Sequence, residues 1–218
     1  MTDSIPFNLN LHTARLLMRE PFFAALSRRV DKTPTSALPT AGVRVNPHTQ
    51  QFELLYNPEF MGALSDEHKL GVLMHEFYHL VFEHVTGRKP IDGLKRIDNI
   101  AMDLAINGLP EMTGKLPNEA NPGPMMPSGE PMKGVFPGEG PFADLPPKMS
   151  YEWYLEALKK MGEEQGDGEG GQGQPGEPGE PGDGDPYGGA DSFDNHEGFG
   201  KGDATTQEIA KERLKEAV

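Results

Sequence analysis

Two histidines flank an acid and two aromatic residues in the segment His75-Glu76-Phe77-Tyr78-His79. In an α-helix, residues four apart lie one turn apart on the same face, so both imidazoles can reach one metal ion. Zinc binds imidazole nitrogen at ~2.0–2.1 Å in tetrahedral geometry, and two histidines from one helical turn can supply two of its four ligands. Glu76 is then placed to take a proton from a zinc-bound water rather than to bind the ion. The spacing predicts a zinc site with Glu76 as the catalytic base.

A third ligand is expected beyond this HExxH motif. The chain has no cysteine, which leaves His, Asp and Glu as its metal ligands. On a continuous helix His84 lies about 180° around the axis from His75, so a surface position is favoured over ligation. Asp103 is preferred, because the 24 positions that follow His79 allow a tight turn and an antiparallel return. Asp98 is the reserve ligand.

Polar residues recur at every fourth position of the next expected helix, at Asn99, Asp103 and Asn107. The simplest interpretation of this stripe is a solvated helix face, and for Asn107 it is at least as well supported as any role at the site. Asn99 or Asp98 could orient a ligating imidazole through its second ring nitrogen, as metal sites usually require.

Two helices are expected to position these groups. The first starts at the capping residue Ser65, is apolar on nearly every side, and runs to about Thr86, with Gly87 as its stop. Such a helix belongs in the middle of a domain. The second runs from about Ile91 to Asn107.

The N-terminal part combines helical and strand patterns. Asn8 to Val30 has apolar residues at helical spacing, as one helix or as two short ones that meet before Pro21. Thr33 to Thr40 is expected to be a loop. Alternating residues 42–46 and 51–56 flank a turn and predict a β-hairpin. If its second strand is a sheet edge, it could bind an extended peptide by strand addition.

The segment Leu109 to Met149 is rich in Pro, Gly and Met and shows no periodicity, so a long loop is expected. A short amphipathic helix then starts at Ser150. Its Trp153, Tyr154 and Leu158 are expected to dock on the core.

The C-terminal part explains the composition of the chain, which has 218 residues, 35% hydrophobic content and a net charge of −14. Residues 162–204 hold twelve acids against the single basic Lys201, so they carry −11 of that charge. So few apolar groups predict a largely disordered acidic linker, before a last helix over residues 205–218. The negative linker excludes nucleic acid as a partner.

No segment reaches the ~20 apolar residues that span a bilayer, and the polar N-terminus lacks a secretory pattern. These features predict a cytoplasmic protein that does not enter membranes.

Four segments together resemble the predicted metal-dependent peptidases, a family of bacteria and their phages. They are Tyr56-Asn-Pro-Glu-Phe, Leu64-Ser-Asp-Glu, Gly71-Val-Leu-Met-His-Glu-Phe-Tyr-His-Leu and Asn99-Ile-Ala-Met-Asp-Leu-Ala-Ile-Asn. In many bacterial members a von Willebrand A-like domain follows, whereas phages carry shorter versions. This chain has no room for that domain after Leu158.

The resemblance implies a zincin-like α+β fold, in which a small antiparallel hairpin or sheet packs on helices. It implies His75 and His79 as zinc ligands, Asp103 as the third, and Glu76 as the base. We expect the peptidase domain to occupy residues 1–161, followed by the linker and the last helix.

Two functions are therefore compared. The first is a zinc metalloendopeptidase whose partner is a protein or peptide substrate. The second is a catalytically inactive zincin-like module whose acidic tail recruits a partner, and a metal-dependent hydrolase of another bond is a weaker third. Tyr56, Tyr151 and His196 are candidates for stabilising the oxyanion in the first. The sequence does not indicate an oligomeric state.

Overall fold

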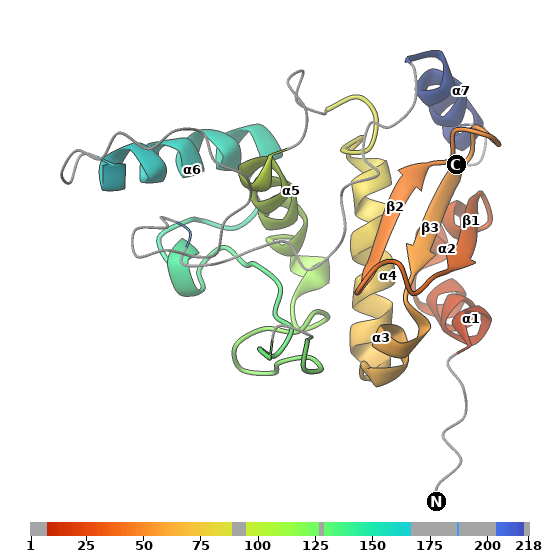
Figure 1. Cartoon of the computed structure of the whole chain (residues 1–218), viewed down its shortest axis with the longest axis horizontal. Helices are drawn as coiled ribbons and strands as arrows, with labels where there is room; N and C mark the ends of the chain where they lie inside the picture. The colour runs from red at the N-terminus through yellow and green to blue at the C-terminus, as the bar shows by residue number, and fades with distance from the viewer. Residues whose placement is uncertain (1–7, 89–94, 127–128, 167–186, 188–203, 216–218) are drawn as a thin grey trace, which may run out of the picture.

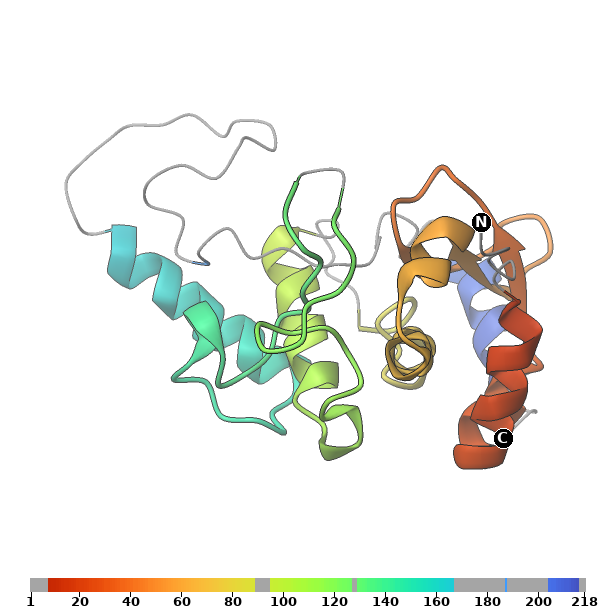
Figure 2. The ribbon, with the colours of Figure 1, turned by 90° about the horizontal axis from the view of Figure 1, so that it is seen from below.

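The computed structural model describes residues 8–88, 95–126, 129–166, 187 and 204–215. These residues form helices and a small three-stranded sheet, which confirms the expected α+β class. In Figure 1 the central helix α4 (Asp66–Val81) has the sheet on one side and α5 (Arg96–Asn107) on the other. Figure 2, seen from below, shows the same order. No helix in the described ranges is both long and apolar enough to cross a membrane.

Two short helices begin the fold, α1 (Leu9–Arg19) and α2 (Pro21–Ser27). The side chain of Asn8 caps α1 by accepting a hydrogen bond of 3.0 Å from the amide of Asn10. Pro21 lacks an amide hydrogen and starts the second helix, a position that proline favours. Of the two expected alternatives, the pair of helices separated at Pro21 is confirmed.

The sheet has the order β1-β3-β2, with β1 (Val30–Pro34), β2 (Ala41–Val45) and β3 (Phe52–Tyr56). β2 and β3 pair antiparallel, which confirms the predicted hairpin. β1 pairs parallel to β3, so part of the segment expected to be a loop is a strand. β3 is therefore the central strand, and the suggestion that it offers a free edge to a peptide is wrong.

A buried carboxylate joins the three strands. Glu53 on β3 accepts a hydrogen bond of 2.6 Å from Thr33 Oγ1 on β1. It also accepts bonds of 3.0 and 2.8 Å from Arg44 Nε and Nη2 on β2, and one of 3.3 Å from Asn46 Nδ2. Burial raises the pKa of Glu53, but the hydrogen bonds and the Arg44 charge together lower it below its ordinary value.

Because the folded state holds Glu53 with a lowered pKa, its charge stabilises the fold above the unfolded pKa of about 4.3, and this contribution is lost as pH falls through the folded pKa. We expect Glu53→Gln to cost about 2 kcal/mol at pH 7 and much less near pH 3. Urea unfolding at both pH values measures the difference. A cost that stays the same at both pH values would contradict this role for the charge.

Asn57 caps the short helix α3 (Pro58–Ala63), and Ser65 Oγ caps α4 by accepting a 3.1 Å hydrogen bond from the amide of His68. The next turns of α4 are buried on almost all sides. Phe77 of α4 is fully buried and stacks on Phe23 of α2, with ring centroids 6.4 Å apart. As expected, this helix lies in the interior of the fold.

α4 ends at Val81, so the expectation that it reaches Thr86 is wrong. Glu83 adopts a left-handed conformation with φ 59°. Its amide donates to Leu80 O at 3.1 Å, and the amide of His84 donates to His79 O at 2.9 Å. This is the Schellman pattern of a helix end, with a glutamate in the position that glycine usually occupies.

The remaining helices are α6 (Tyr151–Gly166) and α7 (Ala204–Lys215). α6 packs on α5, with Tyr154 and Leu158 fully buried, whereas Trp153 is 37% exposed and does not dock as expected. The expected start of α5 near residue 91 lies outside the described residues. So do most of the acidic segment 162–204 and the end of the last helix.

The long loop between α5 and α6 is irregular apart from two short 3₁₀ turns, η1 (Pro110–Met112) and η2 (Gly140–Phe142). It packs against α4, where Asn121 Nδ2 lies 3.1 Å from His68 Nε2. At Gly71 the loop approaches so closely that a Cβ atom would lie 1.8 Å from the carbonyl oxygen of Lys115. The absence of a side chain at residue 71 thus lets this loop pass over α4.

Gly71→Ala is expected to destabilise the fold by about 3 kcal/mol, because the added Cβ atom would clash with the backbone of Lys115. The cost of this clash exceeds the roughly 1 kcal/mol that alanine gains over glycine in helix propensity. Gly62→Ala in α3 is the matched control, since Gly62 is exposed. Chemical denaturation of both variants measures the costs. A Gly71 variant as stable as the control would show that the loop does not need this close approach.

Candidate metal centre

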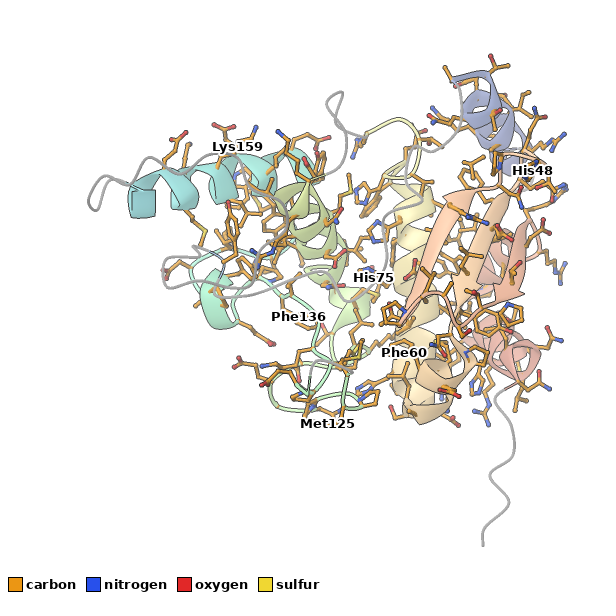
Figure 3. All side chains as sticks on the ribbon, in the orientation of Figure 1. His48, Phe60, His75, Met125, Phe136 and Lys159 are labelled. Carbon is orange, nitrogen blue, oxygen red and sulfur yellow. The ribbon has the colours of Figure 1, made fainter. Side chains whose placement is uncertain are left out.

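Three buried side chains meet where α4 faces α5. His75 and His79 come from one face of α4, and Asp103 comes from the middle of α5. The Nε2 atoms of His75 and His79 are 3.0 Å apart, and each lies 3.4 Å from Asp103 Oδ1. Figure 3 shows the His75 side chain between the two helices. The structure thus brings together the three residues that the sequence predicted as ligands.

These distances fit the ligand atoms of a tetrahedrally coordinated ion. Bonds of ~2.0–2.1 Å to zinc place neighbouring ligand atoms roughly 3.3 Å apart in a tetrahedron. The three observed separations, 3.0, 3.4 and 3.4 Å, lie close to that value. The set of two imidazole nitrogens and one carboxylate oxygen also suits zinc. One ion could therefore be bound by all three atoms, with a fourth position left for another ligand.

The far nitrogen of His75 is held by an amide whose orientation is fixed. Asn107 Nδ2 donates a 2.8 Å hydrogen bond to the carbonyl oxygen of Val135, so its Oδ1 must face His75 Nδ1, 2.9 Å away. An amide oxygen can only accept, so His75 carries its proton on Nδ1. The lone pair of Nε2 then points towards His79 and Asp103, as metal binding requires.

Asn107 is 5% exposed, so the interpretation of this residue as part of a solvated helix face is wrong. Its spacing of four from Asp103 is the sequence signal that places it beside the site. We expect Asn107→Leu to weaken zinc binding by roughly 10–100-fold, because the orientation of His75 is lost. Asn107→Asp keeps an acceptor and should bind more tightly than the leucine variant. Zinc titration against a chelating dye measures this, and equal affinities of wild type and leucine variant would refute the role.

His84 is fully buried beside the site, so its predicted surface position is wrong. The turn at Glu83 ends α4 early and brings His84 back towards the helix. His84 Nδ1 lies 3.0 Å from His79 Nδ1. His84 therefore faces the ring nitrogen of His79 that points away from Asp103. The three residues that could hold a metal ion are His75, His79 and Asp103, without His84.

Asp98, one of the two candidates for orienting an imidazole, is bonded to other groups. Asp98 accepts hydrogen bonds of 3.0 Å from the amide of Lys95, which caps α5, and of 3.0 Å from the hydroxyl of Tyr151. Asn99 lies one turn before Asp103, and its buried amide oxygen has no hydrogen-bond partner in the described part of the chain. Neither contact of Asp98 involves an imidazole of the site.

Glu76 is fully buried and follows His75 directly on α4, about 100° further around the helix axis. Of the residues suggested for stabilising an oxyanion, Tyr151 donates its hydroxyl hydrogen to Asp98. Burial and the neighbouring Asp98 raise the pKa of Tyr151. Tyr56 ends β3, where burial raises its pKa, and His196 lies outside the described residues.

The HExxH motif thus lies on the central helix of an α+β fold, with an acid from the following helix beside it. The chain matches the family described as "Putative metallopeptidase domain" over residues 6–216, nearly its whole length, and it belongs to that family. The family membership confirms the resemblance drawn from the motifs and indicates a metal-dependent peptidase acting on peptide bonds. Searches of curated proteins and of solved structures found no match.

Proposed function

We propose that this protein is a zinc-dependent metalloendopeptidase, with His75, His79 and Asp103 as the metal ligands and Glu76 as the general base. The observation that carries this proposal is the spacing of the three ligand atoms, 3.0 to 3.4 Å, on two packed helices. Zinc bound there would lower the pKa of a bound water towards ~7 and polarise the carbonyl of the scissile bond.

The protein's own residues would carry the proton. Glu76 lies next to a ligand in sequence, and its carboxylate would accept a proton from the attacking water and pass it to the leaving amine. Asn107 would hold His75 with its lone pair towards the ion. The negative carboxylate of Asp103 would lower the net charge of the metal site from +2 to +1.

The complete burial of all four side chains favours a second candidate, a structural ion that joins α4 to α5 without catalysis. Such an ion would stabilise the fold, because binding to the folded state alone adds to its stability. The acidic tail would then serve to recruit a partner. The two candidates differ in whether metal removal abolishes cleavage or only lowers stability.

The test is cleavage of an unfolded generic protein by the purified full-length chain. We expect zinc-loaded protein to cleave it, a strong chelator to stop the reaction, and added zinc to restore it. Metal-dependent thermal stability without any cleavage would instead identify the structural ion. Cleavage that persists after all metal has been removed would overturn the proposed function.

A further inference from the structure

The turn that ends α4 has a result beyond stopping the helix, because it places a third histidine against the metal centre. The amide of His84 donates to the carbonyl oxygen of His79 at 2.9 Å, while Glu83 provides the left-handed residue that the turn needs. Lys211 of α7 forms an ion pair of 3.1 Å with Glu83 Oε2. Both the backbone of the turn and a distant helix therefore hold the segment that carries His84.

The ring of His84 is surrounded by other aromatic rings. Its centroid lies 5.1 Å from the ring of His79 and 5.7 Å from the rings of both Phe82 and Tyr151. Tyr151 is itself held by the hydrogen bond of 3.0 Å from its hydroxyl to Asp98. Groups from α4, α6 and the turn thus surround the His84 ring, and its Nδ1 atom lies 3.0 Å from His79 Nδ1.

The position of the proton between these two nitrogens follows from the chemistry of metal binding. A neutral imidazole carries one proton, and a nitrogen that binds a metal must offer its lone pair. If His79 binds through Nε2, its proton lies on Nδ1 and is donated to His84 Nδ1. The proton of His84 then lies on its Nε2.

We propose that His84 is a positioning residue, whose Nδ1 acceptor fixes the tautomer and ring orientation of His79 for zinc. This inference rests on the proposed function, since it assumes that the ion binds at His79 Nε2. Asn107 accepts from His75 in the corresponding way, so each ligating imidazole has its own acceptor. Mutation of such partners typically weakens metal binding 10–100-fold.

Two substitutions of His84 separate the loss of the hydrogen-bond acceptor from the loss of side-chain packing. Asparagine and leucine side chains have the same number and branching of non-hydrogen atoms, and both lack the imidazole ring, but only asparagine can place an oxygen near the position of Nδ1. We expect His84→Leu to weaken zinc binding roughly 10–100-fold, and His84→Asn to stay within a few-fold of wild type. Competition with a chelating dye measures the affinities, and unfolding of the metal-free proteins measures how much stability each variant loses independently of zinc.

The outcomes separate this inference from the proposed function. A wild-type chain without zinc affinity overturns both. If wild type binds zinc, equal weakening in both variants, or none in His84→Leu, overturns the role of His84 alone.

A measurement on zinc-loaded wild type needs no variant and decides the matter if His84→Leu does not fold. Long-range ¹⁵N–¹H NMR of the histidine rings reports which nitrogen carries the proton. We expect Nδ1–H for His79 and Nε2–H for His84. The reverse assignment overturns the inference.

Discussion

Glu76→Gln is expected to abolish peptide cleavage and leave zinc bound. The amide cannot accept the proton of the attacking water, whereas the ligands His75, His79 and Asp103 are unchanged. Loss of a general base typically costs 10²–10⁴-fold in rate, so we expect kcat to fall by at least about 10²-fold. Cleavage assays at matched zinc content measure it.

The matched control for this substitution is Glu67→Gln, on the first turn of the same helix. The Glu67 side chain is 50% exposed and pairs with Arg19 at 3.1 Å, and it lies about two helical turns before His75. This variant should cleave like wild type. If the Glu76 variant cleaves at the wild-type rate, Glu76 is not the base.

His79→Ala is expected to lose the metal and, with it, all cleavage. His79 contributes one of the three atoms that surround the proposed ion, and its removal also leaves His84 Nδ1 without its neighbour. Two remaining ligands do not hold zinc against dialysis, because protein zinc sites use at least three protein ligands. Elemental analysis after dialysis measures the metal content.

His48→Ala serves as the control, since His48 is exposed in the turn between β2 and β3. It should keep both zinc and activity. Full zinc occupancy in the His79 variant would show that the ion lies elsewhere. Folding of the His79 variant is checked by its far-UV circular dichroism.

Local patterns predicted the elements that build the site. The apolar period of α4, its cap at Ser65 and the alternation on both sides of the 46–51 turn all match the structure. β1 was missed because Asp31, Lys32 and Thr33 follow Val30 without apolar alternation. Its pairing with β3 is parallel and distant in sequence, so no local signal predicts it.

The sequence predicted those parts of the candidate site in which helical spacing determines which side chains share a face. The four-residue spacing of His75 and His79, and the position of Asp103 on the next helix 24 residues after His79, predicted which side chains meet. His84 was misplaced because its prediction assumed that the helix continues without a break to about Thr86. Glu83 adopts the left-handed conformation instead, and this single residue changes the direction of the chain.

Zinc K-edge X-ray absorption of the wild-type protein tests the central claim most directly. We predict one zinc per chain with two imidazole nitrogens and oxygen ligands at ~2.0–2.1 Å, of which Asp103 supplies one and solvent another. Asp103→Ala should lose the ion. A spectrum with a third imidazole, or full zinc occupancy in Asp103→Ala, would contradict the account.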